Sequence, residues 1–411
     1  MTGLDRDQRL LFATRSVRLF GYGLVSVILV LYLAEAGLDG SRVGALLTLT
    51  LVGDAAISLW MTTRADRLGR KRMLLAGAGL MLLAAAVFAA TRDFWLLCLA
   101  ATIGVISPSG NEVGPFLAVE QSALTQNLAN ERRTSVLAWY NLAGSLATAL
   151  GAQVGGAAVT VLRARGVEAI TSFRVVILGY GVVGLALLVL FTLLSPSVEP
   201  APDRRVGRLV LGLSHSKGIV ARLSVLFALD AFGGGLVVTS LVAYWFHRRF
   251  GVEPALLGTI FMGANVLAGF SALSAAWVAR RIGLINTMVA THLPSNVLLA
   301  LVPLMPTLPL AIGVLLLRFS ISQMDVPTRQ SYLMAVVSPE ERSAAAGVTG
   351  IARTLGAALA PLIAAPLLAS SALLSVPFLL SGGIKSAYDL ALWASFRAVR
   401  PPEEAARARS G

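Results

Sequence analysis

The sequence has few charged residues, one cysteine and three histidines. Asp, Glu, Lys and Arg make up 13% of the 411 residues, against about 25% in an average soluble domain. Cys98 stands alone, which excludes a disulfide framework. The histidines are His215, His247 and His292, too scattered to indicate a metal site. We therefore expect neither a metal nor another cofactor.

Long apolar runs fill most of the chain. Hydrophobic residues make up 56% of it, and the mean hydropathy is +0.77. A helix needs about 20 mostly apolar residues to cross a bilayer. These runs do not alternate apolar and polar residues, so helices are expected rather than a barrel. We predict an all-α integral membrane protein with twelve transmembrane helices at 10–36, 41–62, 72–91, 94–126, 135–162, 172–194, 220–246, 255–278, 286–304, 309–337, 343–370 and 376–398.

The first apolar run also resembles a secretory signal, because Leu19–Leu33 is followed by Ala34-Glu35-Ala36. A signal core has about 7–15 residues. Here the apolar character starts near Leu10 and extends to Leu33, so an uncleaved first helix is the better interpretation.

Basic residues lie at the ends of the apolar runs. The net charge of +13 therefore indicates membrane orientation rather than nucleic-acid binding. With the N-terminus in the cytoplasm, most Lys and Arg outside the spans fall on the cytoplasmic side, which predicts that both termini lie there. The connection after residue 194 is the longest and divides six helices from six. We predict a six-helix bundle at 1–194, a cytoplasmic central loop at 195–219, a second six-helix bundle at 220–398 and a cytoplasmic tail at 399–411.

The two predicted halves share a weak internal repeat. Residues 18–25 match 230–237, and Tyr32 matches Tyr244 at the same spacing. Further along, Gly37, Gly44 and Gly69 match Gly251, Gly258 and Gly283 after a small insertion. Internal repeats of this kind are typical of transporters that alternate access around a site at the membrane midplane.

The loop between the second and third spans reads Thr62-Thr63-Arg64-Ala65-Asp66-Arg67-Leu68-Gly69-Arg70-Lys71. It resembles the signature loop of the major facilitator superfamily, although Thr62 stands where that family has a leading glycine. The resemblance extends over the whole chain and implies two pseudo-symmetric six-helix bundles. It also implies that Asp66, Arg67, Gly69, Arg70 and Lys71 form a cytoplasmic latch. The plain alternative is a basic cytoplasmic loop with no further role.

The same resemblance implies that helices 1, 4, 7 and 10 line the transport cavity. All four carry ionisable residues, which are costly within a bilayer and usually face a cavity or a partner. The residues expected along the substrate and proton pathway are Arg18, Tyr22, Asn111, Glu112, Glu120, Asp230, Asp325 and Arg329.

Several roles remain open for these charges. Arg15 and Arg18 could instead extend to the cytoplasmic surface, or Arg18 could meet Asp230 at the matching position of the repeat. Glu120 and Arg329 could form a gate ion pair rather than part of a substrate site. Glu112 is the favoured proton carrier, with Asp325 as the alternative. Outside these helices, Lys385 and Asp389 are expected to pair with each other because they are four residues apart.

We predict a secondary transporter of a small polar or amphipathic solute, with proton-coupled efflux as the favoured mode. Span 5 supports efflux weakly, since Gly151–Gly156 resembles part of an antiporter element in which Ala152 replaces proline. No nucleotide-binding loop occurs, so an ion gradient is the expected energy source. The expected location is the bacterial inner membrane, and the expected partners are the solute, protons and lipid, with the chain a monomer. The alternatives are an uncoupled facilitator, an importer, a non-transporting receptor or partner protein, and a membrane enzyme, which the lack of a catalytic motif disfavours.

Overall fold

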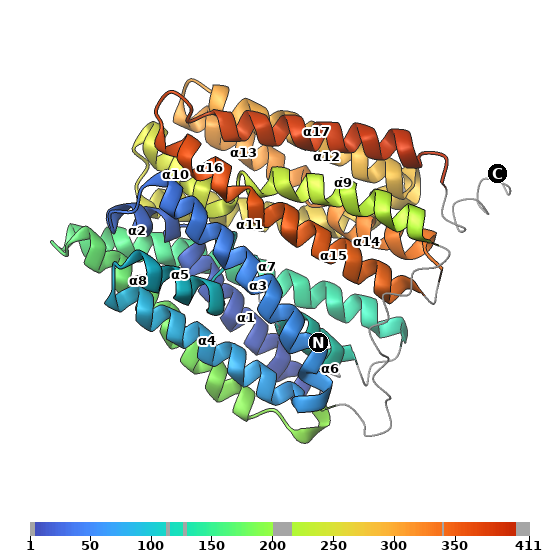
Figure 1. Cartoon of the computed structure of the whole chain (residues 1–411), viewed down its shortest axis with the longest axis horizontal. Coiled ribbons are helices and arrows are strands. Elements are labelled where there is room, and N and C mark those ends of the chain that lie inside the picture. Colours follow the sequence, from blue (N-terminus) through green and yellow to red (C-terminus); the bar gives the residue numbers. More distant parts are fainter. Residues whose placement is uncertain (1–4, 112–115, 126–129, 200–215, 339–340, 400–411) are drawn as a thin grey trace. The chain divides into compact units, whose positions relative to one another are not determined.

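A computed structural model describes residues 5–111, 116–125, 130–199, 216–338 and 341–399 (Figure 1). Within these ranges every regular element is a helix, which confirms the predicted all-α class. Nine of the described helical segments are long and apolar enough to cross a membrane, and α1 with α2 makes a tenth if their 42° bend lies within one span. The two predicted spans outside this set are 94–126, divided in the structure into α5 and α6, and 376–398, which corresponds to α17.

The distribution of side chains is that of a protein in lipid. Large apolar residues are exposed along the helices, among them Val182 at 65% and Val225 at 70%. Charged side chains are buried instead, with Arg18 and Asp389 both 0% exposed. Water would favour the opposite arrangement, whereas lipid solvates apolar side chains and leaves charges to be paired inside the protein.

The described part of the chain belongs to two compact units, which we treat separately. The first comprises Met1–Val206 and Val238–Val266, and the second Gly207–Val237 and Leu267–Gly411. These units follow spatial contacts, whereas the predicted bundles follow the internal repeat, so the bundle boundaries at 194 and 220 stay a prediction.

The helices of the first unit pack mainly as α1 against α7 and α8, and α4 against α8 (Figure 1). Glycines allow α1 and α7 to approach closely, since a Cβ on Gly151 would lie 2.0 Å from the Phe20 carbonyl oxygen. The elements are α1 (Arg6–Ser26), α2 (Leu29–Glu35), α3 (Gly40–Leu68), α4 (Arg70–Ala90), α5 (Phe94–Ile103), α6 (Phe116–Thr125), α7 (Asn130–Ala164), α8 (Ala169–Thr192), the 3₁₀ turn η1 (Pro196–Val198), α10 (Thr239–Phe250) and the start of α11 (Pro254–Ile282).

Polar contacts join α10 and α11 to this first unit. The Ser240 N–H donates to the Pro108 carbonyl at 3.1 Å, and Thr239 Oγ1 donates to the Ser109 carbonyl at 2.9 Å. The N–H of Ala255 donates to Thr160 Oγ1 at 3.0 Å. The chain between α5 and α6 thus supplies two carbonyl groups that accept hydrogen bonds from the start of α10.

In the second unit, α9 lies between α15 and α17 (Figure 1). Helix α12 packs against α17, α14 and α13. Buried aromatic residues such as Phe227, Tyr332 and Phe396 fill the interior. The elements are α9 (Lys217–Gly235), the end of α11, α12 (Leu284–Leu301), the 3₁₀ turn η2 (Val302–Leu304), α13 (Leu308–Ile321), α14 (Asp325–Val336), α15 (Arg342–Leu359), α16 (Pro361–Ala369) and α17 (Val376–Phe396).

The backbone repeats features at the matched glycines. Gly37 and Gly251 have φ of +92° and +67°, and Gly69 and Gly283 have φ of +101° and +85°. Side chains rarely adopt such angles, so glycine is needed at each turn. The helix breaks after Ser26 in α1 and after Gly235 in α9 also fall near matching places. The two halves of the sequence therefore form similar turns and breaks.

Candidate functional site

Arg18 and Glu120 form a buried ion pair inside the first unit. Arg18 Nη1 donates to Glu120 Oε1 and Nη2 donates to Oε2, both at 2.7 Å, and both side chains are 0% exposed. Thr14 Oγ1 donates to the same carboxylate at 2.9 Å, and the Tyr140 hydroxyl also donates to it. The ring of Phe116 lies 4.5 Å from the guanidinium. Both oxygens of Glu120 therefore take part in a two-pronged pair with Arg18, and two hydroxyl groups donate to the same side chain.

Other expected residues on helices 1 and 4 have varied surroundings. Arg15 is 6% exposed and donates to Asn141 Oδ1 at 3.1 Å, so neither it nor Arg18 extends to the surface. Tyr22 is fully buried in α1. Asn111 is exposed, and its backbone N–H donates to Ser109 Oγ at 3.2 Å. Glu112, the favoured proton carrier, lies outside the described residues.

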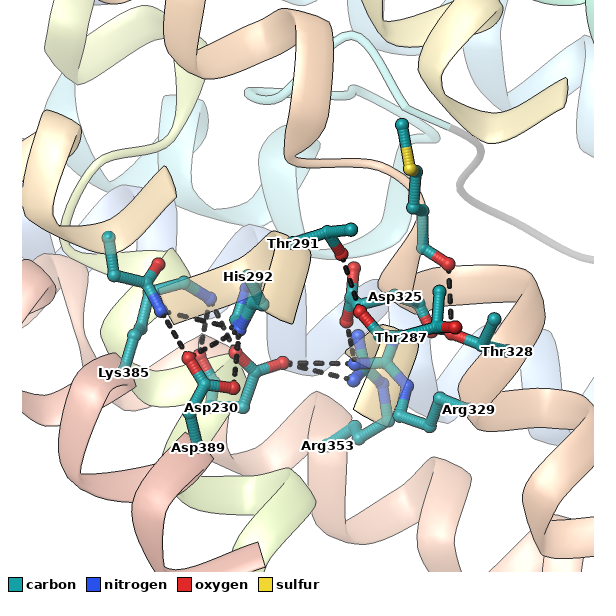
Figure 2. A network of polar contacts seen from close by, with 12 residues as sticks. Asp230, Thr287, Thr291, His292, Asp325, Thr328, Arg329, Arg353, Lys385 and Asp389 are labelled. Carbon is teal, nitrogen blue, oxygen red and sulfur yellow. Dashed lines mark hydrogen bonds and ion pairs between the residues drawn. The ribbon is translucent and has the colours of Figure 1, made fainter. Parts of the chain in front are cut away.

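Asp230 on α9 is the centre of a charged network in the second unit (Figure 2). Lys385 Nζ on α17 donates to Asp230 Oδ1, and Arg329 Nη1 on α14 donates to Oδ2 at 3.0 Å. Arg353 Nη1 on α15 lies 3.4 Å from Oδ2. Asp230 is 4% exposed. One carboxylate therefore links four helices through three cations.

Arg329 also holds Asp325, one turn earlier in α14. Its Nη1 donates to Asp325 Oδ2 at 3.0 Å. Arg329 is 6% exposed and Asp325 is 4% exposed. Asp325 and Arg329 therefore form a buried ion pair that shares its arginine with Asp230.

Sequence reasoning missed His292 on α12. Its Nδ1 lies 2.9 Å from Asp389 Oδ1, and its Nε2 lies 3.8 Å from Asp230 Oδ1. Asn296, one turn further along α12, donates to Asp389 Oδ2 at 2.8 Å. His292 lies near Asp230 and Asp389, which are far from it in sequence, so no spacing of ligand residues along the chain indicates this cluster. Its position within an apolar run was the available signal.

One expected pairing is wrong. Lys385 binds Asp230 and not Asp389, which instead meets His292. Within the first unit Arg18 pairs with Glu120, and within the second Asp230 pairs with Arg329. The approach of Arg18 to Asp230 and the gate between Glu120 and Arg329 stay predictions. Helical periodicity places a charge on a face of its helix, but it does not identify the helix opposite.

The two ion pairs are related by the internal repeat with their charges exchanged. Arg18 and Asp230 occupy matching positions, and Glu120 and Arg329 lie at nearly equivalent places in the two halves. Each pair joins a first helix to a fourth helix of its half. In both halves the first and fourth helices are joined by an ion pair, but the helix that carries the positive charge in one half carries the negative charge in the other.

The signature loop is bound to the segment after α8. Glu199 accepts from the Arg70 N–H at 2.7 Å and from the Lys71 N–H at 3.1 Å, which caps the start of α4. Lys71 Nζ donates to the Thr192 and Leu194 carbonyls, both at 2.7 Å, at the end of α8. Each charge meets the helix end that it favours. The side chains of Asp66 and Arg67 lie outside the described part of the structure.

Comparison with known proteins identifies the family. The model of the Major Facilitator Superfamily matches residues 11–361. The chain belongs to this superfamily. Its members are secondary transporters and not enzymes, so the protein is a multi-pass membrane protein and a secondary transporter of a small molecule.

A curated relative and several solved structures are similar over nearly the full chain. An uncharacterised membrane protein of Saccharomyces cerevisiae is 28% identical over 429 residues, covering 96% of this chain and 95% of the relative. A mutant of the nucleoside transporter NupG has a TM-score of 0.76 at 13% identity, covering 95% of this chain and 99% of that one. A D-xylose-proton symporter has a TM-score of 0.72 at 14% identity, covering 94% and 97%. These structures share the fold, and the relative from yeast gives no support for a bacterial location.

Proposed function

We propose that this superfamily member is a proton-coupled secondary transporter of a small polar or amphipathic solute, with efflux as its direction. The observation that carries the proposal is the ionic network around Asp230, buried among helices that face lipid elsewhere. Burying charges in this way is costly, and replacing them with apolar residues is often neutral or stabilising. Such a network is therefore better explained by transport than by folding.

We infer that the solute is polar from two hydrogen-bond donors close to the Asp230 network. Among the residues that the structure describes, neither the buried Nε of Arg318 nor the hydroxyl of Ser322 has a hydrogen-bond partner. Arg318 lies one turn before Ser322 at the end of α13. Ser322 is 5% exposed. A solute with hydrogen-bond acceptors would satisfy both donors, whereas a purely apolar one would satisfy neither.

The pathway that we propose includes the residues expected from sequence. Arg18, Tyr22 and Glu120 would contribute from the first unit, and Asp230, Asp325 and Arg329 from the second. Asn111 and Glu112 belong to the proposed pathway from sequence alone. We place the protein in a plasma membrane with both termini cytoplasmic, and assign the signature loop, from Asp66 to Lys71, to control of the change between the two access states.

The test is proton movement linked to solute in liposomes. The purified full-length chain is reconstituted with a pH-sensitive dye inside, and small polar and amphipathic solutes are added singly under an imposed pH gradient. We expect at least one solute to change the internal pH faster than in protein-free liposomes, and Asp230→Asn to abolish the difference. A solute that exchanges across the membrane without moving protons would identify a facilitator and overturn the coupling.

A further inference from the structure

The buried carboxylates within the predicted spans differ in what holds them. Glu120, Asp230 and Asp325 each lie within ion-pair distance of an arginine or lysine. Asp389 differs among those that the structure describes, because its hydrogen-bond partners are the imidazole of His292 and the amide of Asn296. The first three thus have Arg or Lys partners, whereas the main partner of Asp389 is a histidine, the side chain whose unperturbed charge change lies nearest neutral pH.

The geometry orients the imidazole. Asn296 Nδ2 donates to Asp389 Oδ2 at 2.8 Å, while Asp389 Oδ1 lies 2.9 Å from His292 Nδ1 (Figure 2). An ionised Asp389 favours the tautomer with its proton on Nδ1, as a carboxylate does when it orients a histidine elsewhere. The lone pair of Nε2 then faces Asp230 Oδ1, 3.8 Å away.

We propose that His292, oriented by Asp389, binds the transported proton at Nε2. This inference rests on the proposed proton coupling and identifies its carrier. The proton enters from water on one side and leaves to water on the other. When it is bound, an imidazolium lies between two carboxylates, Asp389 at Nδ1 and Asp230 at Nε2. His292 is 4% exposed, so the charge is stabilised by these partners rather than by solvent.

Binding a proton would change the ion pairs of Asp230. The surrounding charged and titratable groups come from the helices about the imidazole: Asp230 on α9, Arg318 on α13, Asp325 and Arg329 on α14, Arg353 on α15, and Lys385, Tyr388 and Asp389 on α17. Lys385 and Nε2 of His292 both approach the same oxygen, Asp230 Oδ1. An imidazolium would compete with the lysine there and weaken the link between α9 and α17. Proton binding is thereby coupled to helix movement.

The first experiment detects the proton itself. The other histidines, His215 and His247, are replaced by glutamine, so that ¹⁵N NMR of the full-length chain in lipid nanodiscs reports His292 alone. We expect the imidazole to gain a proton between about pH 5 and 8, and the midpoint of this change to differ in Asp389→Asn, which keeps the shape and removes the charge. Asp39→Asn, at an exposed ion pair with Arg42, is the matched control and leaves the midpoint unchanged. An imidazole that keeps one protonation state throughout this range overturns the proposal.

The second experiment separates this proposal from the function on which it rests. In the liposome assay, with the solute that gives the largest wild-type signal, His292→Gln should reduce the ratio of proton movement to solute exchange at least tenfold. In Asp389→Asn, the pH of half-maximal proton movement should follow the NMR midpoint, which a merely structural role would not produce. Coupling that survives in His292→Gln but disappears in Glu112→Gln would assign the carrier to Glu112 and leave the proposed function standing. Absence of proton movement in the wild type would overturn both.

Discussion

At the scale of single residues, the two halves meet the cost of buried charge in opposite ways. The first half buries an arginine on its first helix and a glutamate on its fourth, Arg18 and Glu120. The second half buries an aspartate and an arginine at the corresponding places, Asp230 and Arg329. Glu120 has two further neutral donors, whereas Asp230 has two further cations. If His292 binds a proton as proposed, the pairs of the second half are the ones that this proton redistributes.

The Arg18–Glu120 pair should show strong energetic coupling. Removing one partner leaves the other charge buried, which costs about 3–5 kcal/mol. We expect Arg18→Gln and Glu120→Gln each to lower the unfolding temperature of the detergent-solubilised protein, and the double variant to lose much less than the sum of the two. The exposed pair Arg42 and Asp39 is the control, because its coupling should stay below about 1 kcal/mol. Additive losses at Arg18 and Glu120 would contradict the paired geometry.

Residue roles could be predicted from the sequence only in part. The buried positions of Arg18, Asp230 and Asp325 follow from charges within apolar runs, which must avoid lipid. Their partners do not follow, since a helix presents a face to several neighbours and periodicity does not choose among them. Lys385 illustrates this limit. The expected partner was Asp389, four residues further along the same helix, but Lys385 binds Asp230 on α9.

At the scale of elements, the signature loop gains its fixed conformation from a residue in the predicted central loop. Glu199 caps α4, and Lys71 binds the carbonyls at the end of α8. The composition of 195–219 suggested a linker throughout, yet its first residues form η1 and bind this loop. In the sequence, Glu199 is an acidic residue after a short polar turn, and such a pattern is common in linkers. It therefore does not by itself predict a helix cap.

Glu199→Gln should loosen the first turn of α4. Its carboxylate accepts two backbone N–H groups at a helix N-terminus, where a negative charge is favoured. Loss of a cap costs about 1 kcal/mol, which corresponds to roughly fivefold faster amide exchange at Arg70 and Lys71. Hydrogen–deuterium exchange with peptide-level mass spectrometry measures the change. Glu168→Gln is the matched control, because Glu168 precedes α8 without a side-chain capping bond; equal effects of the two substitutions would exclude the capping role.

The matched glycines should respond alike to alanine. Gly69 and Gly283 have positive φ between two helices, and such conformations cost other residues about 1–3 kcal/mol. Gly69→Ala and Gly283→Ala should therefore both lower the unfolding temperature. Gly79, within α4 and with open space at its Cβ position, is the control, and Gly79→Ala should be neutral or stabilising by up to about 1 kcal/mol. If only one of the two substitutions lowers the unfolding temperature, the two turns are not equivalent in their contribution to stability.

At the scale of the whole molecule, membrane insertion and internal repetition were predictable because both depend on composition along the chain. Long apolar runs fix where helices cross, and glycines at repeated spacings mark turns that the structure shows at Gly37, Gly69, Gly251 and Gly283. The family then fixes the fold. The identity of the solute depends on a few donors and acceptors inside the protein, such as Arg318 and Ser322, and no pattern in the chain specifies what they bind.

The orientation of the chain rests on the distribution of its basic residues and can be tested directly. Lys and Arg near the ends of spans stay on the cytoplasmic side during insertion. With twelve spans and an N-terminus in the cytoplasm, reporter fusions after Arg208 and after Arg400 should both read cytoplasmic. A fusion after Arg165, in the turn between α7 and α8, is the control and should read the opposite side. If the fusions after Arg208 and Arg400 report different sides, the second half has an odd number of crossings, and the even division of spans between the halves is wrong.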